Sequence, residues 1–241
     1  MPGFQTSADR FRLAFLAAAL AAGLALPSAA EAKGDCKGDA GPGVDWQECN
    51  KGMLMLEGSD LSGANLSDTD FSSTDLRNAK LAGANLEKAT LIRASLAGAS
   101  ADKASFARAE AYRTSFAGMS AQGSSFASAE LQRSDFSNAK LTGADFEKAE
   151  LGRAMFNGAT ITGTKFSLAN LSRADFTGVA FEGPLNFDRA FLYLTRIEGL
   201  DLSKATGLAQ WQVDLACGDA KTKLPAGLKV PGTWPCKFTN D

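Results

Sequence analysis

The sequence contains no histidine, and neither sign of charge dominates it. Without histidine the chain cannot build a Ser-His-Asp triad, a histidine-ligated metal site or the usual proton shuttle near neutral pH. The 25 lysines and arginines nearly balance the 27 aspartates and glutamates, and a net charge of −2 argues against a nucleic-acid-binding patch or an acidic tail. Phosphate-binding glycine loops, nucleophile elbows and EF-hand loops are also missing. We therefore expect no enzyme, no cofactor and no metal site.

Long apolar runs are equally scarce, because a single one occurs, at residues 13–26. This run is too short to cross a bilayer comfortably. A basic segment precedes it, and a proline followed by small residues comes after it. This pattern predicts a secretory signal peptide over residues 1–32, cleaved after Ala32, with cleavage after Ala30 as the near alternative. An uncleaved membrane anchor is less favoured. After cleavage we expect no membrane span and a periplasmic or secreted protein.

Cysteine is rare but even in number, as is typical of an exported chain with disulfides. The four cysteines are Cys36, Cys49, Cys217 and Cys236, and they allow three pairings. If the two ends of the chain lie far apart, local pairing is expected, which gives Cys36–Cys49 and Cys217–Cys236. The alternative is that some of them remain free thiols. The absence of CxxC pairs and of histidine disfavours a zinc site and a redox site.

The middle of the chain is a repeat with a period of five residues. Positions 56, 61, 66 and onward to 181 hold twelve leucines, ten phenylalanines, one isoleucine and three alanines. A small residue, most often alanine, stands two positions before most of these centres. A period of five matches neither that of a helix nor that of a strand. It matches a chain that points two side chains inward and then turns a corner.

A second period, four times as long, indicates that four such walls complete one coil. It appears in an arginine column and in a glutamate column beside it: Arg93, Arg113, Arg133, Arg153 and Arg173, with Glu110, Glu130 and Glu150. Phenylalanine occupies every second centre from 106 to 176. Two opposite walls are therefore predicted to carry large rings and the other two smaller groups, which keeps a narrow core evenly filled.

The units Ala64-Asn65-Leu66-Ser67-Asp68 and Ala84-Asn85-Leu86-Glu87-Lys88 match the A(N/D)LXX motif, as does the segment at 144–148. The chain resembles the pentapeptide-repeat proteins. This resemblance implies an all-β fold, a right-handed quadrilateral β-helix of about eight coils over residues 44–204, with about 4.8 Å per coil. Gly183-Pro184 marks a slip of one residue. Residues 33–43 are expected to form an N-terminal loop, and residues 205–241 a C-terminal helix and proline-rich cap.

Two local features complete the expectation for the coils and their ends. Glycine and asparagine fill the last slot of two opposite walls, which predicts positive φ there. The arginine column fills that slot on another wall, and for it we expect a turn without positive φ. The C-terminal helix is expected to begin after an N-cap at Thr206 and to end at Gly218.

The arginine column has two interpretations. The favoured one is a self-neutralised ladder, in which each glutamate pairs with the arginine three residues later. The alternative is a docking strip for an anionic partner, such as a polysaccharide or an acidic protein.

For the whole chain, the sequence favours a monomeric, non-catalytic exported solenoid that contacts an unknown protein or envelope component and no nucleic acid. A carbohydrate-binding module is one alternative. The resemblance implies another, since some members mimic DNA and act on gyrase; the signal peptide and the balanced charge disfavour it.

Overall fold

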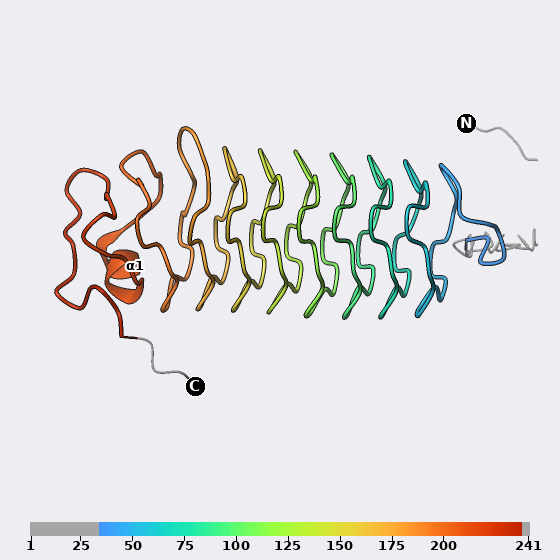
Figure 1. The fold of residues 1–241 in the computed structure, drawn as a ribbon, viewed down its shortest axis with the longest axis horizontal. Helices are drawn as coiled ribbons and strands as arrows, with labels where there is room; N and C mark the ends of the chain where they lie inside the picture. Colours follow the sequence, from blue (N-terminus) through green and yellow to red (C-terminus); the bar gives the residue numbers. More distant parts are fainter. Residues whose placement is uncertain (1–33, 238–241) are drawn as a thin grey trace, which may run out of the picture. The chain divides into compact units, whose positions relative to one another are not determined.

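The computed structural model of the chain describes residues 34–237. The described residues all fall within the second of the two units into which the chain divides, Lys33–Asp241, and everything below concerns them. The predicted signal peptide at 1–32 lies outside the described residues, as do Lys33 and residues 238–241. Within the second unit the chain winds into stacked coils of closely similar outline (Figure 1).

Each coil has four walls, and each wall contributes one residue that pairs in parallel with the corresponding residue of the next coil. Asp45, Asn50, Met55 and Asp60 pair in this way with Asn65, Asp70, Asp75 and Lys80. We name the walls by these pairing residues: wall 1 runs from Asp45 to Thr206, wall 2 from Asn50 to Phe191, wall 3 from Met55 to Cys217, and wall 4 from Asp60 to Lys223.

The pairing is β-like, but the strands are shorter than an all-β fold suggests. Within residues 34–237 every bridge is isolated, because a five-residue wall leaves one pairing residue between two turns. The one regular element of this part is the helix α1, Gln210–Leu215. The predicted four-walled, parallel coil is confirmed; extended strands are absent from the described residues.

The core consists of the inward side chains, and the phenylalanines stack along two opposite walls as predicted. On wall 1 the ring centroids of Phe106 and Phe126 lie 4.8 Å apart with nearly parallel planes. On wall 3 those of Phe116 and Phe136 lie 4.7 Å apart. Across the core, Phe106 meets Phe116 edge-on at 5.9 Å. Both arrangements are favourable for aromatic rings, so each column supports itself and the opposite one.

The corners correct one prediction. The arginine column does have positive φ, between 57° at Arg113 and 61° at Arg153. The reason lies in the hydrogen bonds. The N–H of Arg113 donates to the carbonyl of Gln132 in the next coil, just as the N–H of Gly98 donates to that of Ala117. All four corners are the same left-handed turn, and any residue placed there must adopt it.

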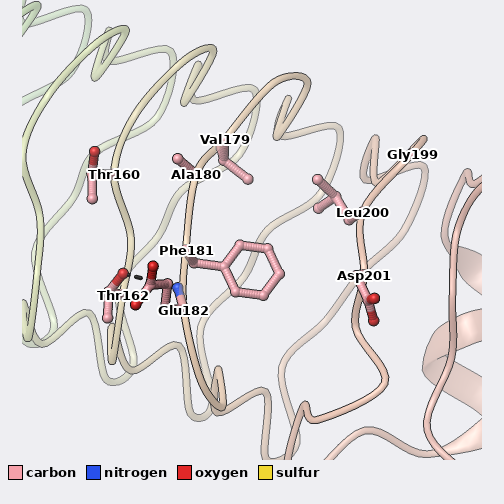
Figure 2. A pocket seen from close by; sticks show the side chains of 9 residues that line it. All are labelled: Thr160, Thr162, Val179, Ala180, Phe181, Glu182, Gly199, Leu200 and Asp201. Carbon is pink, nitrogen blue, oxygen red and sulfur yellow. Dashed lines mark hydrogen bonds between the residues drawn. The ribbon is translucent and has the colours of Figure 1, made fainter.

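The one-residue slip is present, and it interrupts wall 4. Thr160 pairs with Ala180 at a separation of 20, whereas Lys165 pairs with Asn186 at 21. No bridge joins Ala180 to Asp201 in the described chain. Phe181, expected to point inward, is instead partly exposed (Figure 2). The loop that holds the extra residue displaces it, and Leu185 is the next fully buried side chain.

At the N-terminal end, residues 34–43 form a loop that is joined to the first coil by the predicted disulfide Cys36–Cys49. This loop also explains a lysine in an inward position. The Nζ of Lys51 donates to the carbonyl of Cys36 at 2.9 Å and lies 3.8 Å from the ring centroid of Trp46. Burial lowers the pKa of Lys51, against the opposing effect of Asp35 and Asp39.

At the C-terminal end, the helix is shorter than predicted. α1 begins after Ala209, whose N–H donates to Oε1 of Gln212 at 2.7 Å. Thr206 does not cap it, because Thr206 pairs with Asn186 in wall 1. The helix ends before Ala216 rather than at Gly218.

The side-chain amide of Gln212 holds α1 against the last coil. Its Nε2 donates to the carbonyls of Phe187 and Ala190, both at 2.8 Å. The second predicted disulfide, Cys217–Cys236, is present, and the indole N–H of Trp234 donates to the carbonyl of Ala216 at 2.6 Å. None of the helices in residues 34–237 has the length and apolar character needed to cross a membrane.

Candidate functional site

The arginine column stands at the corner between walls 2 and 3, one residue per coil. The coil repeat places successive arginines about 4.8 Å apart, the usual spacing of paired strands. All five side chains are exposed. The corner fixes each backbone while leaving the guanidinium free to reach outward. The result is a straight row of five cations: Arg93, Arg113, Arg133, Arg153 and Arg173.

The predicted self-neutralised ladder is wrong. No ion pair joins this column to Glu110, Glu130 or Glu150 anywhere in residues 34–237. Residues three apart are neighbours on a helix, but here the glutamate is the pairing residue of wall 2 and the arginine is the left-handed residue of the turn that follows it, so no helical spacing brings the two side chains together. Glu150 instead accepts a hydrogen bond from Nδ2 of Asn170, and the guanidinium of Arg113 lies 5.2 Å from the Tyr112 ring.

Other cations do form ion pairs. Arg77 contacts Asp75 and Glu57, and Arg108 contacts Glu87 at 3.0 Å in the coil before it. Hydrogen bonds from Arg77 lower the pKa of Asp75. These are exposed pairs of the kind that contribute little to stability. The column differs from every other arginine of residues 34–237, because each of those has a carboxylate partner.

Three exposed aromatic residues lie at the C-terminal end of wall 2, and they were not predicted from the sequence. The rings of Phe191 and Tyr193 are stacked, with centroids 6.3 Å apart and planes 13° from parallel. Their exposed fractions are 44% and 43%, and that of Trp211 on α1 is 48%. A signal was present: after the slip the inward centre is Leu192, which leaves positions 191 and 193 facing outward.

The interruption of wall 4 opens a cleft of about 610 Å³ between the coils that carry Ala180 and Asp201. Figure 2 shows the ring of Phe181 pointing into this space, with Thr162 and Glu182 on one side and Asp201 on the other. A second cleft of about 480 Å³ adjoins it at Lys204.

The cleft carries little chemistry. Asp201 is already paired with Lys223 at 2.8 Å, and hydrogen bonds from Lys223 and Ser203 lower its pKa to about 2. The remaining carboxylate that lines it is Glu182. Within residues 34–237 no group of three or more Cys, Asp or Glu side chains is arranged to hold a metal ion.

Two family models match the sequence. The model of the pentapeptide repeat region covers residues 101–166, and that of pentapeptide repeats in eight copies covers residues 56–91. The chain is a pentapeptide-repeat protein. The two matches fall on regular coils, outside the slip and the two ends. No curated protein matches the sequence.

Solved structures of pentapeptide-repeat proteins are also similar. HetL, involved in heterocyst differentiation regulation in the cyanobacterium Nostoc, is 25% identical, with 81% of this chain and 95% of HetL covered and a TM-score of 0.30. QnrB1, a plasmid-mediated fluoroquinolone resistance protein, is 19% identical, with 73% and 94% covered and a TM-score of 0.34. A protein of the Arabidopsis thaliana thylakoid lumen is 29% identical, with 50% and 70% covered and a TM-score of 0.23.

Proposed function

We propose that this pentapeptide-repeat protein is a non-catalytic interaction protein that docks an anionic partner along its arginine column. The observation that carries the proposal is the column's lack of carboxylate partners in the described chain, although three glutamates stand on the same wall. Five like charges in a row repel one another unless a counter-charge is supplied. An anionic partner supplies it. The rigid coil holds the row straight, so the partner meets all five cations together.

The site of action is part of the proposal. Both disulfides are compatible with an exported chain, since such bonds persist in oxidising compartments. We infer a periplasmic or secreted monomer, released from a signal peptide near Ala32. We also infer that the coils are right-handed, and that α1 with the stapled C-terminal segment covers the last coil and protects its backbone from edge-to-edge association.

The experiment compares two variants of the full chain, each with five cations replaced by glutamine. The first replaces the arginine column. The second, a control of equal charge, replaces five cations that form ion pairs with neighbouring carboxylates, and these are Arg77, Lys80, Arg108, Lys148 and Arg189. Wild-type protein and both variants are immobilised and exposed to envelope extract of the native host at low and high salt.

At low salt, we expect wild type and the control variant to retain a partner that the column variant does not retain. High salt should release this partner. Circular dichroism should show that all three proteins keep the same fold, because every replaced residue is exposed and none belongs to the core. Capture of the same components by all three proteins would contradict the proposal.

A further inference from the structure

Wall 2 carries two features, and the function proposed above uses one of them. The arginine column follows its edge for five coils, and the exposed aromatic residues Phe191, Tyr193 and Trp211 lie where the wall ends. Among residues 34–237 these three are the aromatic side chains with the largest exposed fractions. We call the column and the aromatic residues together the wall 2 surface.

The aromatic end belongs to the same wall as the column. Phe191 takes the pairing position above Asn170, and Tyr193 takes the outward position above Ser172, just after Phe191 along the wall. α1 lies over the same segment, because Gln212 bonds to the carbonyls of Phe187 and Ala190 and the N–H of Leu194 donates to the carbonyl of Leu215. A ligand that extends along the arginine column therefore reaches the aromatic residues.

The arginines share their positive φ with the other corners of the coils, including non-glycine residues such as Arg108 and Lys148, so this conformation belongs to the fold. What sets the column apart is charge. Arg108 has a carboxylate partner in Glu87 and Lys148 has one in Glu147, whereas no ion pair within the described chain offsets the mutual repulsion of the five column arginines.

We propose that the wall 2 surface binds a linear acidic polysaccharide. This inference rests on the proposed function and names its ligand. Guanidinium groups form two parallel hydrogen bonds with a carboxylate and bind sulfate in a similar way. Sugar rings present a face of C–H groups that packs on aromatic side chains, and tyrosine and tryptophan are suited to such half-wet contacts. An acidic polysaccharide supplies both the repeated anions and the ring faces.

The glutamate column distinguishes this ligand from other polyanions. Glu110, Glu130 and Glu150 stand on wall 2 among the arginines, and a carboxylate accepts hydrogen bonds from sugar hydroxyls. Single-stranded DNA has no hydroxyl groups along its backbone to donate to these carboxylates, so its phosphates meet them without a compensating hydrogen bond. An extended acidic peptide presents side chains to one face about every 6.6 Å, out of step with cations about 4.8 Å apart.

Binding is measured by titrating the full chain with defined probes: polygalacturonate, alginate and heparin as acidic polysaccharides, a neutral glucan, poly-glutamate, and single-stranded DNA. Three variants accompany wild type. One replaces the five column arginines by glutamine, one replaces Phe191, Tyr193 and Trp211 by alanine, and one is the equal-charge control with five ion-paired cations replaced.

We expect at least one acidic polysaccharide to bind wild type and the control equally, to bind each of the other two variants at least tenfold more weakly, and to be released by salt. Replacing Glu110, Glu130 and Glu150 by glutamine should leave that binding no stronger, although it removes three negative charges. The same replacement should strengthen any binding of DNA or poly-glutamate.

Three results would overturn the inference: no binding of any acidic polysaccharide, unchanged binding by the aromatic variant, or equal binding of poly-glutamate or DNA. These results differ in what they imply for the proposed function. If the column variant loses an envelope partner while no polysaccharide binds, the proposed function stands with another ligand. If the column variant also retains every envelope partner, both proposals fail.

Discussion

A left-handed backbone residue stands at almost every corner of the coils, and its side chain decides what that conformation costs. Glycine adopts it freely, whereas residues with a Cβ pay roughly 1–2 kcal/mol. Fifteen glycines and nineteen other residues of the described chain have positive φ. The coil tolerates this cost because each turn is fixed by hydrogen bonds to the next coil.

Replacing Gly143 by alanine should therefore lower the free energy of unfolding by about 1 kcal/mol. Gly143 has a φ of 70°, and a Cβ added there meets no atom within 4 Å, so the loss reflects backbone conformation alone. Urea denaturation followed by circular dichroism measures it. Gly232→Ala is the matched control, since that site is equally open and lacks a positive φ. Equal effects of the two substitutions would refute the argument.

At the scale of elements, a comparison of the coils with the two ends shows which structural features a sequence pattern predicts. The five-residue wall, the aromatic columns, the slip at Gly183-Pro184 and both disulfides follow from spacing in the sequence, because each is repeated or local. The two ends of the coil stack contain no repeated unit, so no periodicity in the sequence predicts their structure. The boundaries of α1 depend on Gln212, whose side chain bonds to carbonyls of the preceding coil that are remote in the sequence, and no local signal reveals such a contact.

The surface columns were harder to predict than the core for a related reason. Inward positions are fixed by packing, whereas outward side chains choose among several partners that spacing alone does not rank. Glu110 and Arg113 are near in sequence yet unpaired, while Arg108 reaches Glu87 in the neighbouring coil. Register did place Phe191 and Tyr193 outward, and reading the outward positions after the slip would have revealed them.

The attachment of α1 can be tested at Gln212. Gln212→Leu removes two hydrogen bonds to buried carbonyls and the one from Ala209, which should cost about 1–3 kcal/mol. Hydrogen exchange should speed up at the N–H groups of Leu194 and Cys217, which bond beside the helix. Asp214→Asn, on the exposed side of α1, should change stability by less than about 0.5 kcal/mol. Faster exchange in the central coils as well would show that α1 is not a separate unit.

For the whole described unit, the important quantity is the constant length of the coil repeat, because it keeps like side chains stacked from coil to coil. In a solenoid, each repeat interacts with its nearest neighbours alone. Removing one full coil, residues 136–155, brings Phe156 into the place of Phe136 and leaves every column aligned. Removing a single wall, residues 141–145, moves Phe146 onto wall 4, above Ala121, and places the smaller Leu151 above Phe126 on wall 1.

The variant that lacks a single wall should therefore melt at a lower temperature than the variant that lacks a full coil. The shorter deletion removes less buried surface, but it breaks the ring stacks that run through Phe126, Phe136, Phe146 and Phe156. Thermal unfolding with the disulfides intact measures both variants against wild type. If stability simply follows the number of residues removed, the columns contribute little, and the stacking of like side chains is not what holds the coils in register.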